Sequence, residues 1–164
     1  MYKIRTAVGI LLTALALASC DNLNGHVTAP TTFGLNTSDS AAFALRPDAF
    51  TAQSVSDAFC PSLSPFLVPV NVLVQAGSIG VSVTDIAFRF TDRHGVEMPP
   101  VTLAAPVLTK QFGSTLVQAR SAREFPLSFR LGCGVQPVGT IVVIVGSRDG
   151  NGRTGSVSLT GTLH

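Results

Sequence analysis

Large aromatic side chains other than phenylalanine are nearly absent from this sequence. It contains no Trp, a single Tyr at position 2, and ten Phe residues. Proteins that bind sugars on exposed aromatic platforms use Trp or Tyr, because those rings combine an apolar face with a polar handle. The composition therefore argues against this class of binding protein and predicts that the Phe residues form the core.

Charge is scarce as well. Asp, Glu, Lys and Arg make up 12% of the chain, and two of its eleven basic residues, Lys3 and Arg5, stand within the first five positions. The remaining charges are scattered, without the basic stripe that neutralises nucleic-acid phosphates. We therefore expect no nucleic-acid partner.

Residue types that carry catalysis are few. The three His residues lie at positions 26, 94 and 164, and the chain has no G-x-S-x-G motif. Only "DRHG" brings an acid and a histidine together, as Asp92 and His94. This pair leaves a Ser-His-Asp hydrolase open as the alternative function, but a solvated hairpin turn explains the motif better, and we expect no catalytic residue.

A calcium site is the second chemical possibility. The segment "RDGNGR" places Asp149 and Asn151 at alternate positions, as oxygen ligands would be placed. However, it offers one carboxylate between Arg148 and Arg153, which repel a cation. A tight turn is the favoured interpretation. No metal and no cofactor are expected.

The amino terminus has the parts of an export signal. A basic head, "MYKIR", precedes an uncharged stretch from Thr6 to Ser19. This stretch is too short for a good transmembrane helix, which needs about 20 residues. It ends in Leu17-Ala18-Ser19-Cys20, which resembles the lipobox of bacterial lipoproteins. The alternative is a plain signal peptide that happens to end at a cysteine.

The resemblance implies that the signal peptide, residues 1–19, is cut off and that Cys20 is acylated. Two or three acyl chains would hold the protein firmly to a membrane of the bacterial cell envelope, outside the cytoplasm. Cleavage would remove Lys3 and Arg5 and leave nine basic against nine acidic residues. It would also leave Cys60 and Cys133 as a pair, which in an exported protein predicts one disulfide; two separate buried thiols remain the alternative.

Residues 20–40 are expected to be a flexible tether, because residues 21–40 are rich in Asn, Thr, Ser and Gly and show no hydrophobic periodicity. From Ala41 onward, apolar residues alternate with polar ones, which is typical of β-strands. The clearest cases are "FLVPVNVLV", "IAFRF", "FPLSFRLGC" and "SVSLTGTL". "TIVVIV" is apolar throughout, which predicts a central strand covered on both faces. "TDRHGVE" and "SRDGNGR" are expected hairpin turns.

Two irregularities are predicted within these strands. Pro69 places the start of its strand at a sheet edge, because proline cannot donate to a neighbouring strand. In "VSVTDIAFRF" the apolar phase changes: Val81 and Val83 are out of step with Ile86 and the residues that follow. A bulge or bend is therefore expected at Thr84-Asp85.

This pattern over residues 41–164 predicts an all-β fold of about seven to nine strands. It resembles the immunoglobulin-like antiparallel β-sandwich domains of bacterial exported proteins. The chain as a whole is thus expected to be a membrane-anchored lipoprotein. A non-catalytic role in binding or envelope structure is favoured, with envelope proteins as partners, over a small membrane-tethered hydrolase.

Overall fold

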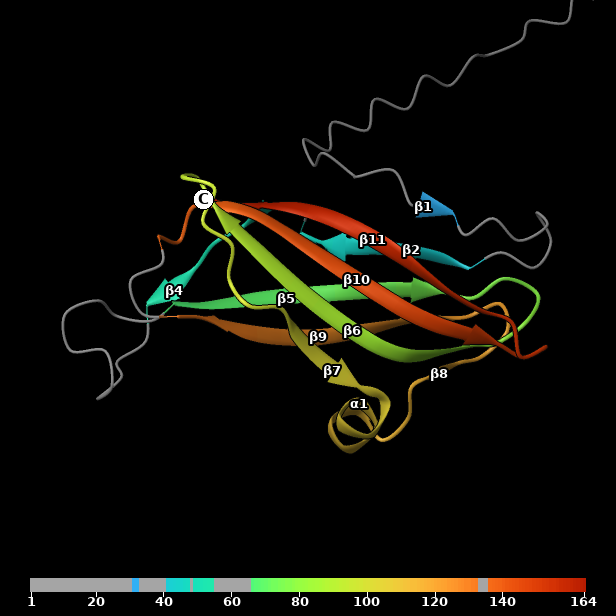
Figure 1. Cartoon of the computed structure of the whole chain (residues 1–164). Coiled ribbons are helices and arrows are strands. Elements are labelled where there is room, and N and C mark those ends of the chain that lie inside the picture. The colour runs from blue at the N-terminus through green and yellow to red at the C-terminus, as the bar shows by residue number, and fades with distance from the viewer. Residues whose placement is uncertain (1–30, 33–40, 48, 55–65, 133–135) are drawn as a thin grey trace, which may run out of the picture.

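The chain folds into two facing β-sheets with one short helix at their edge (Figure 1). This computed structural model describes residues 31–32, 41–47, 49–54, 66–132 and 136–164. One sheet contains β1 (Thr31–Thr32), β2 (Ala42–Arg46), β4 (Gln53–Ser54), β5 (Phe66–Gln75) and β9 (Ala122–Leu131). The other contains β3 (Ala49–Phe50), β6 (Val81–Asp92), β7 (Val101–Ala104), β8 (Leu116–Val117), β10 (Gly139–Asp149) and β11 (Thr154–Leu163). The expected all-β sandwich is confirmed.

The chain crosses between the sheets after β2, β3, β5, β8 and β9. The first sheet has the order β1-β2-β5-β9, and the second has the order β3-β11-β10-β6-β7. Such crossovers are those of an immunoglobulin-like sandwich. Nearly all neighbouring strands are antiparallel, as expected, but β3 pairs in parallel with β11. The two-residue β1 lies within the segment expected to be a tether.

The core fills the space between the sheets. The alternating segments predicted from the sequence bury the expected face: β5 contributes four valines, β9 two Phe and two Leu residues, and β11 Val157, Leu159 and Leu163. β10 is central, between β11 and β6. The prediction that it is covered on both faces is wrong, because Val142 and Ile144 on its outer face are only half-buried.

The predicted irregularity in β6 is a β-bulge. Asp85 lies opposite Gly146 and Val83 lies opposite Ser147, so Thr84 has no partner of its own in β10. The extra residue lets Val81 and Val83 point into the core together with Ile86, although the spacing between them breaks the alternation. The break in the alternation of apolar residues in the sequence is therefore caused by this one extra residue, Thr84.

The sequence patterns do not predict the helix α1 (Ala105–Phe112). Its eight residues bury one side chain, Leu108, so no repeated apolar stripe marks it. It closes one edge of the sandwich, where the Phe112 ring packs edge-on against Phe125 at 5.3 Å and Arg123 donates from Nη2 to the Phe112 carbonyl at 2.7 Å. No helix among the described residues has the length and hydropathy to cross a membrane.

Candidate functional site

A hollow of the described surface lies where the chain leaves the first sheet after β2. β2 pairs with β5 from Asn71 to Gln75, and β4 pairs with the other end of β5, at Phe66 and Leu67. Between these two pairings the chain visits the opposite sheet as β3. Residues 68–70 of β5 therefore have no neighbouring strand on that side in the described part of the chain, and the hollow opens beside them.

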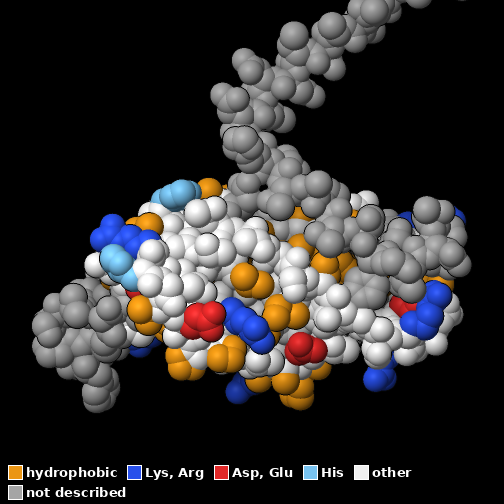
Figure 2. Space-filling model, turned by 45° about the horizontal axis from the view of Figure 1, so that its top comes forward, with side chains coloured by type: hydrophobic (Ala, Val, Ile, Leu, Met, Phe, Trp, Pro, Cys, Tyr) orange, Lys and Arg blue, Asp and Glu red, His pale blue; other side chains and the backbone are white. Residues whose placement is uncertain are grey.

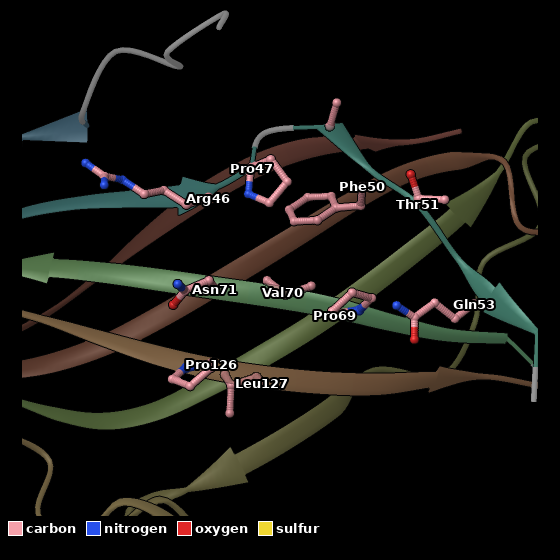
Figure 3. A pocket seen from close by; sticks show the side chains of 11 residues that line it. Arg46, Pro47, Phe50, Thr51, Gln53, Pro69, Val70, Asn71, Pro126 and Leu127 are labelled. Carbon is pink, nitrogen blue, oxygen red and sulfur yellow. The ribbon is translucent and has the colours of Figure 1, made fainter.

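The hollow has a volume of about 420 Å³, which is within the range of small-ligand sites. Figure 3 shows Pro47 and Phe50 on one side of it, and Pro69, Val70 and Asn71 of β5 on the other. Its walls are mainly apolar, with polar side chains from four positions. The lining residues are Arg46, Pro47, Ala49, Phe50, Thr51, Gln53, Pro69, Val70, Asn71, Pro126 and Leu127.

The positions of two prolines show how the backbone of β5 tolerates the gap beside the hollow. Pro69 lies opposite Ser128 and Pro126 opposite Asn71, two positions apart on the β5–β9 ladder. Pairs on an antiparallel ladder alternate between hydrogen-bonded and non-hydrogen-bonded, and proline, lacking N–H, fits the second kind. The backbone nitrogen of Pro69 therefore faces the gap between β2 and β4. The prediction that the start of this strand lies at a sheet edge is wrong, because it pairs with both β4 and β9; a gap within the sheet accommodates Pro69 instead.

A polar group borders the hollow on its outer side. Asn71 donates from Nδ2 to the Glu124 carboxylate at 2.7 Å, and Arg46 lies 3.9 Å from the same carboxylate. Both members of the Arg46–Glu124 pair are about half exposed, so the pair contributes little to stability. The Asn71 Oδ1 atom is buried and has no hydrogen-bond partner among the described residues. A buried acceptor left in this state costs about 1–3 kcal/mol.

The described lining residues offer the hollow little acid–base chemistry. Among them, Arg46 is the one titratable side chain, and Thr51 supplies the one hydroxyl. An arginine stays protonated and can only donate hydrogen bonds. None of the residues of this hollow was singled out as a site in the sequence analysis. The one signal available was Pro69, which indicated an edge but not a concave surface.

The Asp92–His94 pair, considered for a hydrolase, forms a hairpin turn. Asp92 Oδ1 accepts the backbone N–H groups of His94 and Val96, each at 2.8 Å. The imidazole donates no hydrogen bond to this carboxylate; its Nε2 instead accepts from Arg93 Nε at 3.2 Å. In a catalytic triad, the acid orients the imidazole and the imidazole faces a nucleophile. The local geometry here matches the expected solvated turn.

The segment considered for calcium forms the same kind of turn. Asp149 Oδ1 accepts the backbone N–H groups of Asn151 at 2.9 Å and Arg153 at 2.8 Å, and Oδ2 accepts from Arg153 Nε at 2.6 Å. Gly152 adopts a positive φ of 82°, as the matching Gly95 does at 81°. Burial by itself raises the pKa of Asp149, but the hydrogen bonds and charge of Arg153, with the Asn151 N–H, outweigh it and lower this pKa. The carboxylate thus anchors the turn.

No other metal-binding constellation exists among the described residues: His, Cys, Asp and Glu side chains do not gather in threes. Charged side chains are likewise dispersed over the face seen in Figure 2. The predicted lipidation site, Cys20, and the predicted disulfide partners, Cys60 and Cys133, all lie outside the described residues.

Comparisons with known proteins give similarity in fold alone. No protein-family model matches the chain, and a search of curated proteins finds no match. Among solved structures, the Northeast Structural Genomics Consortium target SoR45 aligns with a TM-score of 0.52 and 12% identity, over 76% of this chain and 82% of that chain. The protein named ApaA from Bordetella pertussis aligns with a TM-score of 0.51 and 16% identity, over 75% of this chain and 93% of that chain.

Proposed function

We propose that this protein is a non-catalytic binding module, held to a membrane of the bacterial cell envelope by an acylated Cys20. The observation that carries the binding role is the hollow beside β5, whose described lining residues are mainly apolar and include no acid–base pair. Such a surface can hold the apolar group of a partner without transforming it. The anchor rests on the Leu17-Ala18-Ser19-Cys20 motif and the uncharged stretch before it.

The anchor can be tested by the intact mass of the protein extracted from membranes with detergent. We expect the mass of residues 20–164 plus acyl chains, and a soluble product for Cys20→Ser. The same sample tests the proposed cross-link between Cys60 and Cys133, which should resist alkylation until a reductant is added. A soluble, unacylated wild-type protein would refute the anchored module.

The binding role can be tested by filling the hollow. Thr51→Trp places a large ring among the lining residues, whereas the control Thr102→Trp places the same ring on β7, on the opposite sheet. We expect an envelope protein that co-purifies in stoichiometric amount with the wild type and the control but not with Thr51→Trp. A partner that is retained equally by both variants would remove the hollow from the proposal.

The alternative, a membrane-tethered hydrolase, makes an opposite prediction. It requires His94, so His94→Ala would abolish hydrolysis of its substrate. A binding module would capture its partner equally well with and without this imidazole, because His94 lies in a hairpin turn and does not line the hollow. Partner capture by His94→Ala at wild-type level would favour the binding module.

A further inference from the structure

Among the described residues, β11 forms one edge of its sheet over most of its length. Among the described residues, the only strand on this side is the short β3, which pairs at Thr162 and Leu163. The His164 N–H donates to the Phe50 carbonyl of β3, whereas the Arg153 carbonyl accepts from Asp149 of β10. Because backbone groups alternate in direction along a strand, the even-numbered residues of β11 face away from β10. The backbone N–H and C=O groups of the even-numbered residues from Thr154 to Thr160 therefore face outward, away from β10.

This edge lacks the features by which proteins protect edge strands. The segment Thr154–Leu163 contains no charged residue and no proline, and β11 pairs with β10 without a register shift. At the edge of the other sheet, β9 carries Pro126 and the charged residues Arg123, Glu124 and Arg130. Charges, prolines and bulges prevent an edge strand from pairing with another chain. In contrast to β9, the longer β11 is therefore open to a partner strand over most of its length.

The sequence of β11 is nearly symmetric about Ser158. On either side of it stand Val157 and Leu159, then Ser156 and Thr160, with glycine at positions 155 and 161 beyond them. In an antiparallel pair related by a two-fold axis, each residue on one side of the axis faces its counterpart on the other. The facing residues would be similar in size, and no like charges would meet across the axis.

We propose that β11 pairs antiparallel with β11 of a second copy of this protein, with the two-fold axis passing through Ser158. The ladder runs from Ser156 to Thr160, because β3 occupies the edge at Thr162. Hydrogen bonds between the outward-facing backbone groups join the two β3-β11-β10-β6 sheets into one continuous sheet. The outer faces carry the exposed hydroxyls of Ser156, Ser158 and Thr160, which remain in water.

A proline substitution on the β11 edge, compared with one on the β9 edge, tests which edge forms the dimer. Ser158→Pro removes an N–H that faces the second copy and leaves the β10–β11 ladder intact. The matched control is Ser128→Pro on β9, whose N–H also faces outward, since Ser128 shares the ladder phase of Pro126. By sedimentation of the full lipidated protein in density-matched detergent, we expect dimers for the wild type and Ser128→Pro. Ser158→Pro should raise the dimer dissociation constant at least tenfold.

A cross-link tests the same axis without depending on how Ser158→Pro folds. Residues that face each other across an antiparallel ladder lie within the Cα separation that a disulfide spans. In intact membranes under oxidant, Ser158→Cys should therefore give a dimer that a reductant dissolves, and Ser128→Cys should not. A wild type that stays monomeric at about 100 μM, a Ser158→Cys variant that forms no dimer, or its cross-linking to a different protein would each overturn the proposal.

Discussion

Thr84 is the one residue of β6 whose deletion should leave the core unchanged. It has no partner of its own in β10, since Asp85 lies opposite Gly146 and Val83 opposite Ser147. Without Thr84, Asp85 and Val83 become neighbours in a regular strand, and each keeps its present face. No buried side chain then turns outward, so we expect the free energy of unfolding to fall by less than about 1 kcal/mol.

Deletion of Ala87, three positions further along the same strand, provides the matched control. The bulge can absorb this loss only by turning Ile86 outward and Asp85 inward; if the bulge stays, Val81, Val83 and Ile86 all turn outward. Ile86 is fully buried, so its exposure alone costs about 1.5–3 kcal/mol. A carboxyl group in its place adds at least about 2 kcal/mol. The sum is a large part of the free energy of unfolding of a typical domain, which is about 5–15 kcal/mol.

Urea unfolding, followed by far-ultraviolet circular dichroism, measures both free energies. We expect the Thr84 deletion to unfold near the wild-type midpoint and the Ala87 deletion to be unfolded or nearly so in buffer. Equal destabilisation by the two deletions would refute the reasoning. It would mean that Thr84 itself is required, and that the loss of stability does not depend on which side chains turn away from the core.

Three further outcomes are expected. Gly139→Ala should lower stability by about 1–3 kcal/mol in urea unfolding, because the added Cβ would lie 2.8 Å from the Cα of Asp92 and against the Thr91 carbonyl oxygen, both of them backbone atoms that cannot rotate away; Gly132→Ala, whose Cβ would meet only a methionine methyl at 3.6 Å, should cost less. Asp149 has a folded pKa below the ordinary 3.8, so its stabilisation is complete above that value and is lost as the pH falls through the folded pKa. Melting temperature should therefore fall less steeply below pH 4 in Asp149→Asn than in the wild type, and parallel curves would contradict this. Asn71→Val should keep or raise the melting temperature, since it removes a buried oxygen without a partner, whereas a clear loss would show that this oxygen is satisfied.

Local patterns in the sequence were sufficient to predict the five longest strands, β5, β6, β9, β10 and β11, and several of their details. Alternation predicted which faces of β5, β9 and β11 are buried, because a strand places successive side chains on opposite faces. A break in that alternation predicted the bulge at Thr84-Asp85, because only a surplus residue restores the phase. Asp and Gly spacing predicted both hairpin turns, since their backbone conformations favour these residues. The lipid anchor at Cys20 and the cross-link from Cys60 to Cys133 remain predictions.

Other features depend on contacts between segments far apart in the chain, which no local pattern records. α1 has too few residues for a periodic stripe, and it is held at the sandwich edge by Arg123 and Phe125 of β9. The hollow arises because the chain joins the opposite sheet as β3 between β2 and β4. Pairing with β5 and β11 sets this path. The sequence by itself thus determined the sandwich fold class, its buried faces, its turns and its bulge, since each depends on neighbours in the chain. Only the tertiary structure decided where a concave surface forms and which edge is left open, since both depend on which strands meet.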